Sequence, residues 1–243
     1  MPLLETRGIT VRFGGTTAVD AVDLTLDAGH VTGLIGPNGA GKTTLFNVVT
    51  GMQRPSAGSV LLDGDDITGR SPAKRGRLGV ARTFQRLELF LSLSVRDNVR
   101  VAGDIVKASR RGAYDVEAET ERVLELTGLG AIADREVADI PTGRARVVEV
   151  ARALMTHPRL LLLDEPASGQ TEHETEVFAE MLSGLADDGL GICLVEHDLS
   201  LVMSLCRTIH VLDQGRLIAS GTPEQVRATP EVVAAYIGAE VAR

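Results

Sequence analysis

The hydrophobic positions in the first 63 residues form short runs of the kind that strands produce. Apolar and β-branched residues dominate segments 9–13, 22–26, 31–35 and 60–62, and Gly, Asp and Thr separate these segments. Such punctuation is typical of strands joined by turns. One stretch after Lys42 instead has its apolar residues at helical spacing. The pattern predicts a β-rich lobe that contains one helix.

A different pattern occupies residues 89–140. In segments 95–105 and 116–126, apolar residues recur every three or four positions amid Arg and Glu, and a polar stretch at 109–112 separates the two. This spacing places apolar side chains on one face of a helix. We therefore expect two amphipathic helices joined by a loop, which together make a small helical lobe.

After residue 140, helical and strand-like patterns alternate. This alternation predicts a parallel sheet covered by helices on both faces. Four consecutive leucines at 160–163 agree, because a strand buried on both faces shows no polar alternation. In chain order, we expect a helix at 143–155, a strand at 160–163, a helix at 172–186, a strand at 192–196, a helix at 199–205, a hairpin at 208–219 turning at 213–215, and short helices at 223–228 and 230–237.

Composition and charge narrow the class of protein. The chain has 243 residues, a formal net charge of −8 and a pI of about 5.2, so no overall basic field draws it to nucleic acid. We expect the basic stretch 70–77 to be a solvated loop. Cys193 and Cys206 lie in apolar patterns, which predicts buried, reduced thiols rather than a disulfide. Residues 1–7 do not resemble a signal segment and no run reaches about 18 apolar residues, so we do not expect the chain itself to cross a membrane.

The strongest chemical signal is a glycine-rich loop after the apolar run 31–35. It fits the pattern Gly-x-x-x-x-Gly-Lys-Ser/Thr, in which backbone N–H groups surround phosphate oxygens, the lysine reaches the outer phosphates and the hydroxyl binds magnesium. A helix that begins near Gly41 adds the positive end of its dipole. A purely structural turn would need neither Lys42 nor Thr43. The predicted nucleotide-binding residues are Gly36, Pro37, Asn38, Gly39, Ala40, Gly41, Lys42, Thr43 and Thr44.

Two carboxylates at the end of the leucine strand supply the second part of a nucleotide site. Asp164 ends an apolar strand, where a carboxylate is unfavourable unless an ion compensates it, so we assign Asp164 to magnesium. Glu165 follows directly, and neighbouring strand side chains point to opposite faces. We therefore expect Glu165 to orient and deprotonate a water molecule instead of holding the metal. Together with the glycine-rich loop, this pair predicts hydrolysis of ATP or GTP.

The order of these segments resembles that of the ATPase subunits of ATP-binding cassette (ABC) transporters over nearly the whole chain. The resemblance implies an α/β fold of the P-loop NTPase (RecA-like) type, with a parallel sheet, an N-terminal antiparallel β subdomain and an inserted helical subdomain. It implies a single ABC ATPase domain at 1–243, with a core lobe at 1–88 and 141–243 and a helical lobe at 89–140. The implied cofactors are ATP and Mg²⁺.

Three further residues take roles from this resemblance. Phe13 stands where the family stacks an aromatic ring on adenine, and a core phenylalanine is the alternative. Gln85 resembles the glutamine that contacts magnesium and the attacking water while it links the two lobes, and a surface glutamine is the alternative. His197 resembles the switch histidine, which reaches the γ-phosphate and holds Glu165 and water in line. The implied catalytic residues are Glu165, His197, Lys42 and Gln85, and the implied metal ligands are Thr43, Gln85 and Asp164.

The family's signature segment, Leu-Ser-Gly-Gly-Gln, is altered in this chain. In the family it starts a helix whose amides grip the γ-phosphate bound to the opposite subunit. The corresponding residues here are Pro141, Thr142, Gly143 and Arg144, so proline replaces the serine and offers neither a hydroxyl nor an N–H. The next two residues can still donate amides. Thr171 is a second departure, because relatives carry an acidic or amide residue there that communicates across the dimer.

Four features resemble the ATPase subunit of high-affinity branched-chain amino acid importers. They are segments 36–47 and 79–85, the proline in the signature segment, and the tail from 221–227 to 235–238. This resemblance implies an ATP-hydrolysing subunit at the cytoplasmic face of the cell membrane. Its implied partner is a second ABC ATPase subunit in a heterodimer, and a homodimer stays open. Two transmembrane permease subunits and a solute-binding protein complete the implied system, which includes no nucleic acid.

Other functions stay open at this stage. Pro141 and Thr171 favour an ATP-binding regulatory or scaffold subunit with little hydrolysis of its own. The intact Lys42, Asp164, Glu165 and His197 oppose it. The ATPase of another ABC system, for urea or for export, would share the same core. A ribosome-associated relative would carry two cassettes and a basic face, and a chromosome-structuring relative would need long heptads, so the sequence argues against both. The transported solute is not determined.

Overall fold

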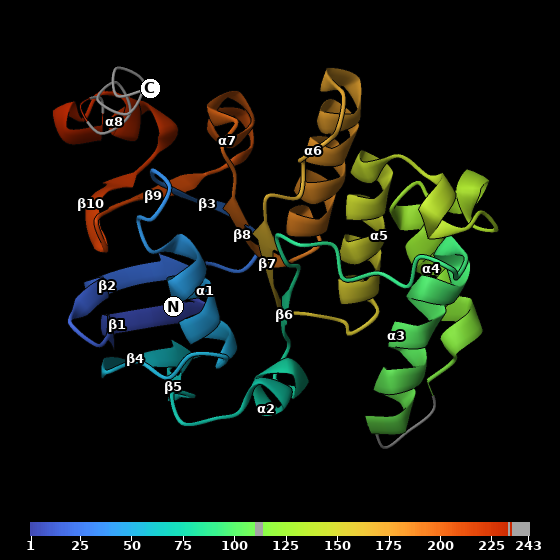
Figure 1. The fold of residues 1–243 in the computed structure, drawn as a ribbon, viewed down its shortest axis with the longest axis horizontal. Helices are drawn as coiled ribbons and strands as arrows, with labels where there is room; N and C mark the ends of the chain where they lie inside the picture. The colour runs from blue at the N-terminus through green and yellow to red at the C-terminus, as the bar shows by residue number, and fades with distance from the viewer. Residues whose placement is uncertain (110–113, 233, 235–243) are drawn as a thin grey trace.

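Two sheets form the core of the fold in residues 1–109, 114–232 and 234, which are the residues that this computed structural model describes (Figure 1). The first sheet is antiparallel, in the order β2-β1-β4-β5. Antiparallel pairing such as that of Leu4 with Leu26 makes its strands longer than the expected runs at 9–13, 22–26 and 60–62. The strands are β1 (Leu4–Phe13), β2 (Thr16–Leu26), β4 (Ala57–Leu62) and β5 (Asp65–Asp66).

The second sheet is parallel apart from one edge strand. Its order is β10-β9-β3-β8-β7-β6, and only the pair of β9 with β10 is antiparallel among its described pairs. The four leucines at 160–163 are fully buried, as the place of β7 between β6 and β8 requires. The strands are β3 (Val31–Ile35), β6 (Val80–Arg82), β7 (Leu160–Asp164), β8 (Gly191–Val195), β9 (Thr208–Asp213) and β10 (Arg216–Gly221). The expected α/β fold is confirmed.

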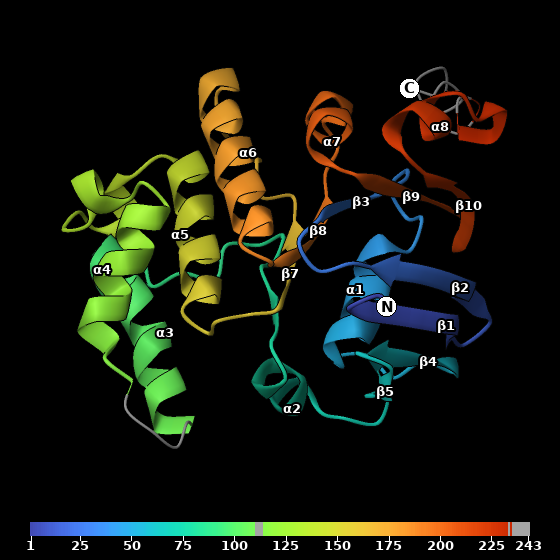
Figure 2. The ribbon, with the colours of Figure 1, turned by 180° about the vertical axis from the view of Figure 1, so that it is seen from behind.

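Helices cover the second sheet and extend beyond it. In Figures 1 and 2, α3 and α4 lie at the end of the molecule farthest from β1, β2 and β4, and α5 stands between them and α6. The two helices expected within 89–140 are present, although the lobe boundaries themselves stay a prediction. The helices are α1 (Lys42–Thr50), α2 (Pro72–Arg77), α3 (Val95–Ser109), α4 (Val116–Leu126), α5 (Thr142–Leu154), α6 (Glu172–Asp187), α7 (Leu199–Leu205) and α8 (Pro223–Arg227), with 3₁₀ turns at Gly130–Ile132 and Val137–Asp139.

Some expectations lie at or beyond the limits of the described residues. The tail at 235–238 falls outside them, and the polar loop at 109–112 and the last helix at 230–237 fall partly outside them; residues 230–232 and 234 are helical, as expected. Within the described ranges, Cys193 and Cys206 are free and buried, and burial raises the pKa of the Cys206 thiol to about 12. No helix in those ranges combines the length and the apolar character that crossing a membrane demands.

The basic stretch 70–77 contains a helix with a buried arginine, so the expectation of a solvated loop was wrong. The Arg75 side chain reaches the C-terminal end of α1. Its Nη1 donates to the carbonyls of Val48 and Val49 at 2.7 Å each, and its Nη2 donates to that of Thr68 at 2.8 Å. Carbonyls at a helix C-terminus lack partners within the helix and carry partial negative charge, so a guanidinium at this point is stabilising. Sequence patterns did not reveal this helix because its only buried side chain is charged.

Replacing Arg75 by Met is expected to destabilise the chain by about 2–4 kcal/mol, because the buried carbonyls at the end of α1 lose their donor. Urea unfolding of the full chain measures the difference. Arg77→Met is the matched control, since Arg77 belongs to the same helix but is exposed, and it should change stability by less than about 0.5 kcal/mol. Equal unfolding midpoints for Arg75→Met and the unchanged chain would contradict the capping role.

Candidate functional site

The glycine-rich loop joins β3 to α1 and packs closely against two other segments. Gly36 and Gly41 have φ angles of 151° and 104°. A Cβ atom at Gly36 would lie 2.0 Å from the carbonyl oxygen of Leu212, and one at Gly41 would lie 2.5 Å from that of Ala18. Only glycine fits these two positions, because both the backbone angle and the available space exclude a side chain. The loop can therefore present its backbone N–H groups at close range to an anion.

Lys42, the first residue of α1, is the buried cation of this loop. Its Nζ donates to the carbonyl oxygens of Gly36 at 2.7 Å and Pro37 at 3.1 Å. Burial lowers the pKa of Lys42, whereas the negative charges of Glu165 and Asp164 act in the opposite direction. A cation at the N-terminal end of a helix, beside a glycine-rich loop, suits the binding of phosphate.

A cavity of about 270 Å³ brings this loop together with the ends of three parallel strands. Residues 38–44 line one side of it. The opposite wall includes residues that follow or end β6, β7 and β8, and these strand ends meet at one edge because the strands are parallel. The predicted residues in this wall are Gln85, Asp164, Glu165 and His197.

Glu165 is the point at which side chains from this wall converge. Its Oε1 accepts a hydrogen bond from Gln85 Nε2 at 3.0 Å, and the same oxygen lies 3.0 Å from Nε2 of His197. The backbone of Glu165 has a φ of 52°, and its N–H donates to the carbonyl of Val195 at 2.9 Å. A positive φ is rare for a residue with a side chain and is often found at functional sites. A carboxylate oriented in this way can accept a proton from water.

Asp164 is buried and is paired with an arginine that sequence analysis gave no role. Its Oδ2 lies 3.0 Å from Nη2 of Arg82, and both side chains are almost inaccessible. Arg82 also donates to Asn47 and lies against the rings of Phe46 and Phe84. A buried carboxylate needs a compensating charge, and Arg82 supplies one. Only the pairing of β6 with β7 brings these two residues together, so no local pattern could have indicated the ion pair.

The donor groups around the cavity fit a hard divalent cation. Thr43, Gln85 and Asp164 offer hydroxyl, amide and carboxylate oxygens, which are the ligand types that Mg²⁺ takes. All three line the same cavity, together with residues of the glycine-rich loop. The chemistry of this donor set therefore agrees with the predicted metal ligands.

Phe13 lies at the end of β1 and is 51% exposed. This exposure excludes the alternative of a core phenylalanine. Stacking on adenine requires an accessible aromatic face, so the position of Phe13 is compatible with this role, which stays a prediction.

The signature-like segment lies at the start of α5 and not around the cavity. Pro141 is the N-cap residue and makes no side-chain capping bond, and Thr142 is exposed. Gly143 is buried against the segment before α6, where a Cβ atom would lie 2.9 Å from the carbonyl oxygen of Gly169. Arg144 approaches a carboxylate of α6 at 3.6 Å. The predicted phosphate contacts of this segment are thus not made within the chain's own cavity.

Thr171, the second departure from the family pattern, has a partner on its own helix. It is the N-cap of α6: its Oγ1 accepts from the N–H of Glu174 at 3.3 Å, and the Glu174 carboxylate accepts from the N–H of Thr171 at 3.0 Å. This reciprocal capping box holds the residue at the helix start.

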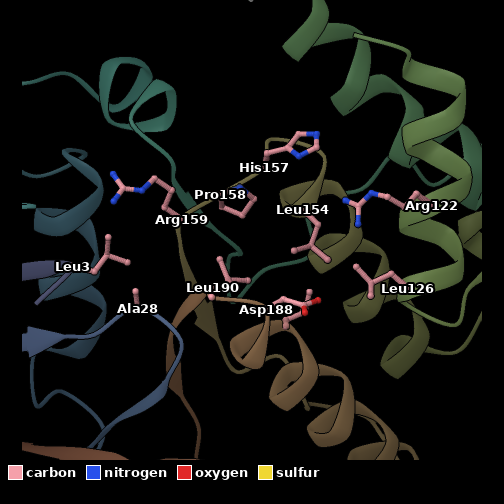
Figure 3. A pocket seen from close by; sticks show the side chains of 12 residues that line it. Leu3, Ala28, Arg122, Leu126, Leu154, His157, Pro158, Arg159, Asp188 and Leu190 are labelled. Atoms are coloured by element: carbon pink, nitrogen blue, oxygen red, sulfur yellow. The ribbon is translucent and has the colours of Figure 1, made fainter.

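A second cavity, of about 380 Å³, lies at the amino-terminal edge of the parallel sheet (Figure 3). Residues just before β7 and β8 and on α4 line it, but none of the predicted site residues does. Two of its cations are already compensated, since Arg159 is paired with Asp63 and Arg122 with Glu119. We therefore assign the candidate site to the cavity beside the glycine-rich loop.

Comparison with known proteins identifies the family of this chain. The chain matches the family "ABC transporter" over residues 19–168 and the family "Branched-chain amino acid ATP-binding cassette transporter" over residues 216–242. It is 40% identical over 250 residues to the high-affinity branched-chain amino acid transport ATP-binding protein BraF of Pseudomonas aeruginosa, with 98% of each chain covered. It is 39% identical over 250 residues to the protein LivG of Escherichia coli K12, which has the same description, again with 98% of each chain covered.

Solved structures give the same result. The ADP conformation of an ATP-binding cassette of an ABC transporter matches with a TM-score of 0.87 and 31% identity, covering 98% of this chain and 99% of the other. A nucleotide-free ATP-binding cassette from an ABC transporter matches with a TM-score of 0.87 and 29% identity, covering 98% and 100%. The resemblance predicted from the motifs is confirmed. The chain belongs to the ABC transporter family, as one of its ATP-binding cassette ATPases.

Proposed function

We propose that this chain is the ATP-hydrolysing subunit of an importer for branched-chain amino acids or a similar small polar solute. The observation that carries the hydrolytic part is the convergence of Gln85 and His197 on one oxygen of Glu165, in a cavity that the glycine-rich loop also lines. The solute class is supported by the names of relatives that are 40% and 39% identical over 98% of the chain.

The loop side of the cavity would bind the nucleotide. Backbone N–H groups of residues 38–44 would surround the phosphates, because the glycines let the backbone approach an anion closely. Lys42 would exchange its loop carbonyls for outer phosphate oxygens, which match its charge better. Phe13, exposed at the end of β1, would stack on adenine.

The opposite wall would activate water. Thr43, Gln85 and Asp164 would hold Mg²⁺, which when bound neutralises phosphate charge. Glu165 would accept the proton of the attacking water, and His197 would keep that carboxylate in line with the terminal phosphate. Both roles depend on positioning more than on covalent chemistry, as is usual in phosphoryl transfer.

A second ATPase subunit is part of the proposal. The residues from Pro141 to Arg144 do not line the chain's own cavity, so they are available to a nucleotide held by another subunit. We infer a dimer in which each nucleotide lies between the loop of one subunit and the signature segment of the other. A heterodimer is favoured because the altered signature of this chain would be compensated by an intact one.

Exposed apolar side chains near the Gln85 segment are the proposed contact for two permease subunits. Phe90 and Leu91 are 49% and 58% exposed. Phe84 and Glu88 precede them in the sequence and, together with side chains of α3 and α5, line a cavity of about 200 Å³. An apolar patch beside a catalytic segment suits a partner whose movement must reach the site. With a solute-binding protein, this assembly would hold the chain at the cytoplasmic face of the membrane.

Pro141 also favours a second candidate, an ATP-binding regulatory subunit with little hydrolysis of its own. Proline provides no N–H at the tip of the signature segment, and Thr171 is engaged in its own capping box. The complete set of Lys42, Asp164, Glu165 and His197 around one cavity opposes this candidate.

Gentle purification from the native membrane through a tag on this chain tests the proposed function. Mass spectrometry should identify a second ATPase, two permeases and a solute-binding protein. In vesicles the complex should show vanadate-sensitive ATP hydrolysis coupled to uptake of leucine. Assembly without such turnover would instead support the regulatory candidate, and turnover coupled only to another solute would contradict the proposed cargo.

The two ATP sites of a mixed dimer are expected to be unequal, because Glu165 serves the nucleotide that faces the partner's signature. Glu165→Gln removes the proton acceptor, so hydrolysis by the dimer should fall about tenfold or more. The equivalent change in the partner should reduce hydrolysis far less, since that site faces Pro141. Equal losses in the two variants would reject the asymmetry.

Restoring the signature is expected to strengthen the weaker site. In a dimer whose Lys42→Ala change leaves only the partner's loop able to bind, Pro141→Ser should tighten the binding of a fluorescent ATP analogue about 2- to 10-fold. Pro141→Ala supplies the N–H without the hydroxyl and should give a smaller gain. No gain from either substitution would argue against a phosphate contact at this position.

A further inference from the structure

Three charged side chains of α5 reach the segment that carries Gln85. Arg146, Glu149 and Arg152 are spaced three residues apart, so they lie along one side of the helix. The segment that they reach, residues 84–88, lies between β6 and α3 and is neither helix nor strand. Such a segment must find other partners for its backbone polar groups. The α5 side chains supply several of them.

Arg146 is hydrogen-bonded to the backbone of two successive residues, Phe84 and Gln85. Its Nη1 donates to the carbonyl of Phe84 at 2.9 Å, and its Nη2 donates to the carbonyl of Gln85. Nη1 also lies 3.0 Å from Oε2 of Glu149, and both charged side chains are at least nine-tenths buried. A buried ion pair of this kind tolerates little displacement, because losing either partner leaves an uncompensated charge.

Glu149 and Arg152 hold the other end of the segment. Oε1 of Glu149 accepts from the N–H of Glu88 at 2.9 Å, and Nη1 of Arg152 donates to the carbonyl of the same residue. The Arg152 guanidinium also lies 5.3 Å from the centre of the Phe90 ring. Burial raises the pKa of Glu149, whereas the Glu88 N–H and Arg146 favour its charged form. The segment is thus bonded to α5 at both ends.

These contacts connect the first turn of α5 with the Gln85 segment, to which the proposed function assigns two different nucleotides. The first turn of α5 carries Thr142 and Gly143, which would meet the nucleotide of the second ATPase, and the next turn carries Arg146. Gln85, held through its carbonyl by Arg146, donates from its side chain to Glu165 at 3.0 Å. A displacement of α5 therefore moves Gln85 relative to the carboxylate that serves the chain's own nucleotide.

We propose that Arg146 and Glu149 form a clamp that couples the signature-like segment of this chain to Glu165. They act as positioning residues, since they touch the backbone of the Gln85 segment and not the cavity. The proposal rests on the proposed function, because the signature-like segment senses a nucleotide only in a dimer. It links the two ATP sites through a path inside one chain that does not use Thr171, which stays in its capping box.

Hydrogen exchange of the isolated full chain tests the clamp without any partner. The double variant Arg146→Met/Glu149→Leu removes both charges together, which a buried pair tolerates better than the loss of one. The amide of Glu88 should then exchange at least about tenfold faster. Arg122→Met is the control, since Arg122 belongs to the neighbouring α4 and pairs with Glu119. Unchanged exchange at Glu88 in the double variant, or equal acceleration in the control, would overturn the clamp.

Kinetics of the assembled transporter test the coupling. In the Arg146→Met variant, kcat should fall about tenfold while the Kd for a fluorescent ATP analogue changes less than about twofold, because the glycine-rich loop is untouched. Arg146→Lys, which keeps the charge and one donor, should recover part of the loss. A parallel weakening of binding and turnover, as general unfolding produces, would count against a positioning role.

A double-mutant cycle isolates the link between the two sites. The partner's loop lysine is changed so that the second site binds no ATP, with and without Arg146→Met in this chain. If the clamp carries the coupling, the two changes together should reduce kcat clearly less than the product of their separate effects. Full multiplicativity would overturn the proposal. A complex that hydrolyses no ATP at all would refute the proposed function, whereas the hydrogen exchange at Glu88 would still decide the clamp.

Discussion

The parallel pairing of β3, β8, β7 and β6 is the constraint on which the site depends. The carboxyl ends of parallel strands lie at the same edge of a sheet, so this arrangement alone brings together residues that are far apart in the sequence. The register matters as much as the order: Asp164 pairs with Val195, and a slip by one residue would exchange the faces toward which Asp164 and Glu165 point. Because both central strands are buried on both faces, such a slip would also disturb the core on either side.

Charged side chains inside the protein are the second organising feature. Arg75 ends α1, Arg82 accompanies Asp164, and Arg146 accompanies Glu149. Buried ion pairs contribute little net stability, since desolvation offsets most of their attraction. Their effect here is geometric: each one holds a backbone segment or a carboxylate in a single arrangement, and phosphoryl transfer depends mainly on such arrangements.

Helix α5 has two surfaces, which under the proposed function would act on two different nucleotides. Its first turn is the altered signature, with Pro141 as N-cap and Thr142 exposed, while its buried side holds the Gln85 segment. The chain departs from the family pattern at Pro141 and at Thr171, the N-cap of α6, which are the positions that the resemblance assigns to contact with a second subunit. The groups that surround its own cavity keep the residue types that hydrolysis needs, so the departures change the relation between subunits more than the chemistry of this one.

The sequence by itself determined most strands and helices, the glycine-rich loop and the acidic pair, because periodicity and the pattern of Gly, Lys and Thr are local. It also indicated Gln85 and His197 as site residues, since the resemblance covers nearly the whole chain, but it did not predict β6, the strand that precedes Gln85. Only the tertiary structure decided that Arg75 is buried, that Phe13 is exposed and that Arg82 lies beside the Asp164 carboxylate. The sequence of a charged segment does not show whether its side chains are buried against partners in the folded protein. The partners here come from segments distant in the chain, and only the completed packing brings them within hydrogen-bonding distance.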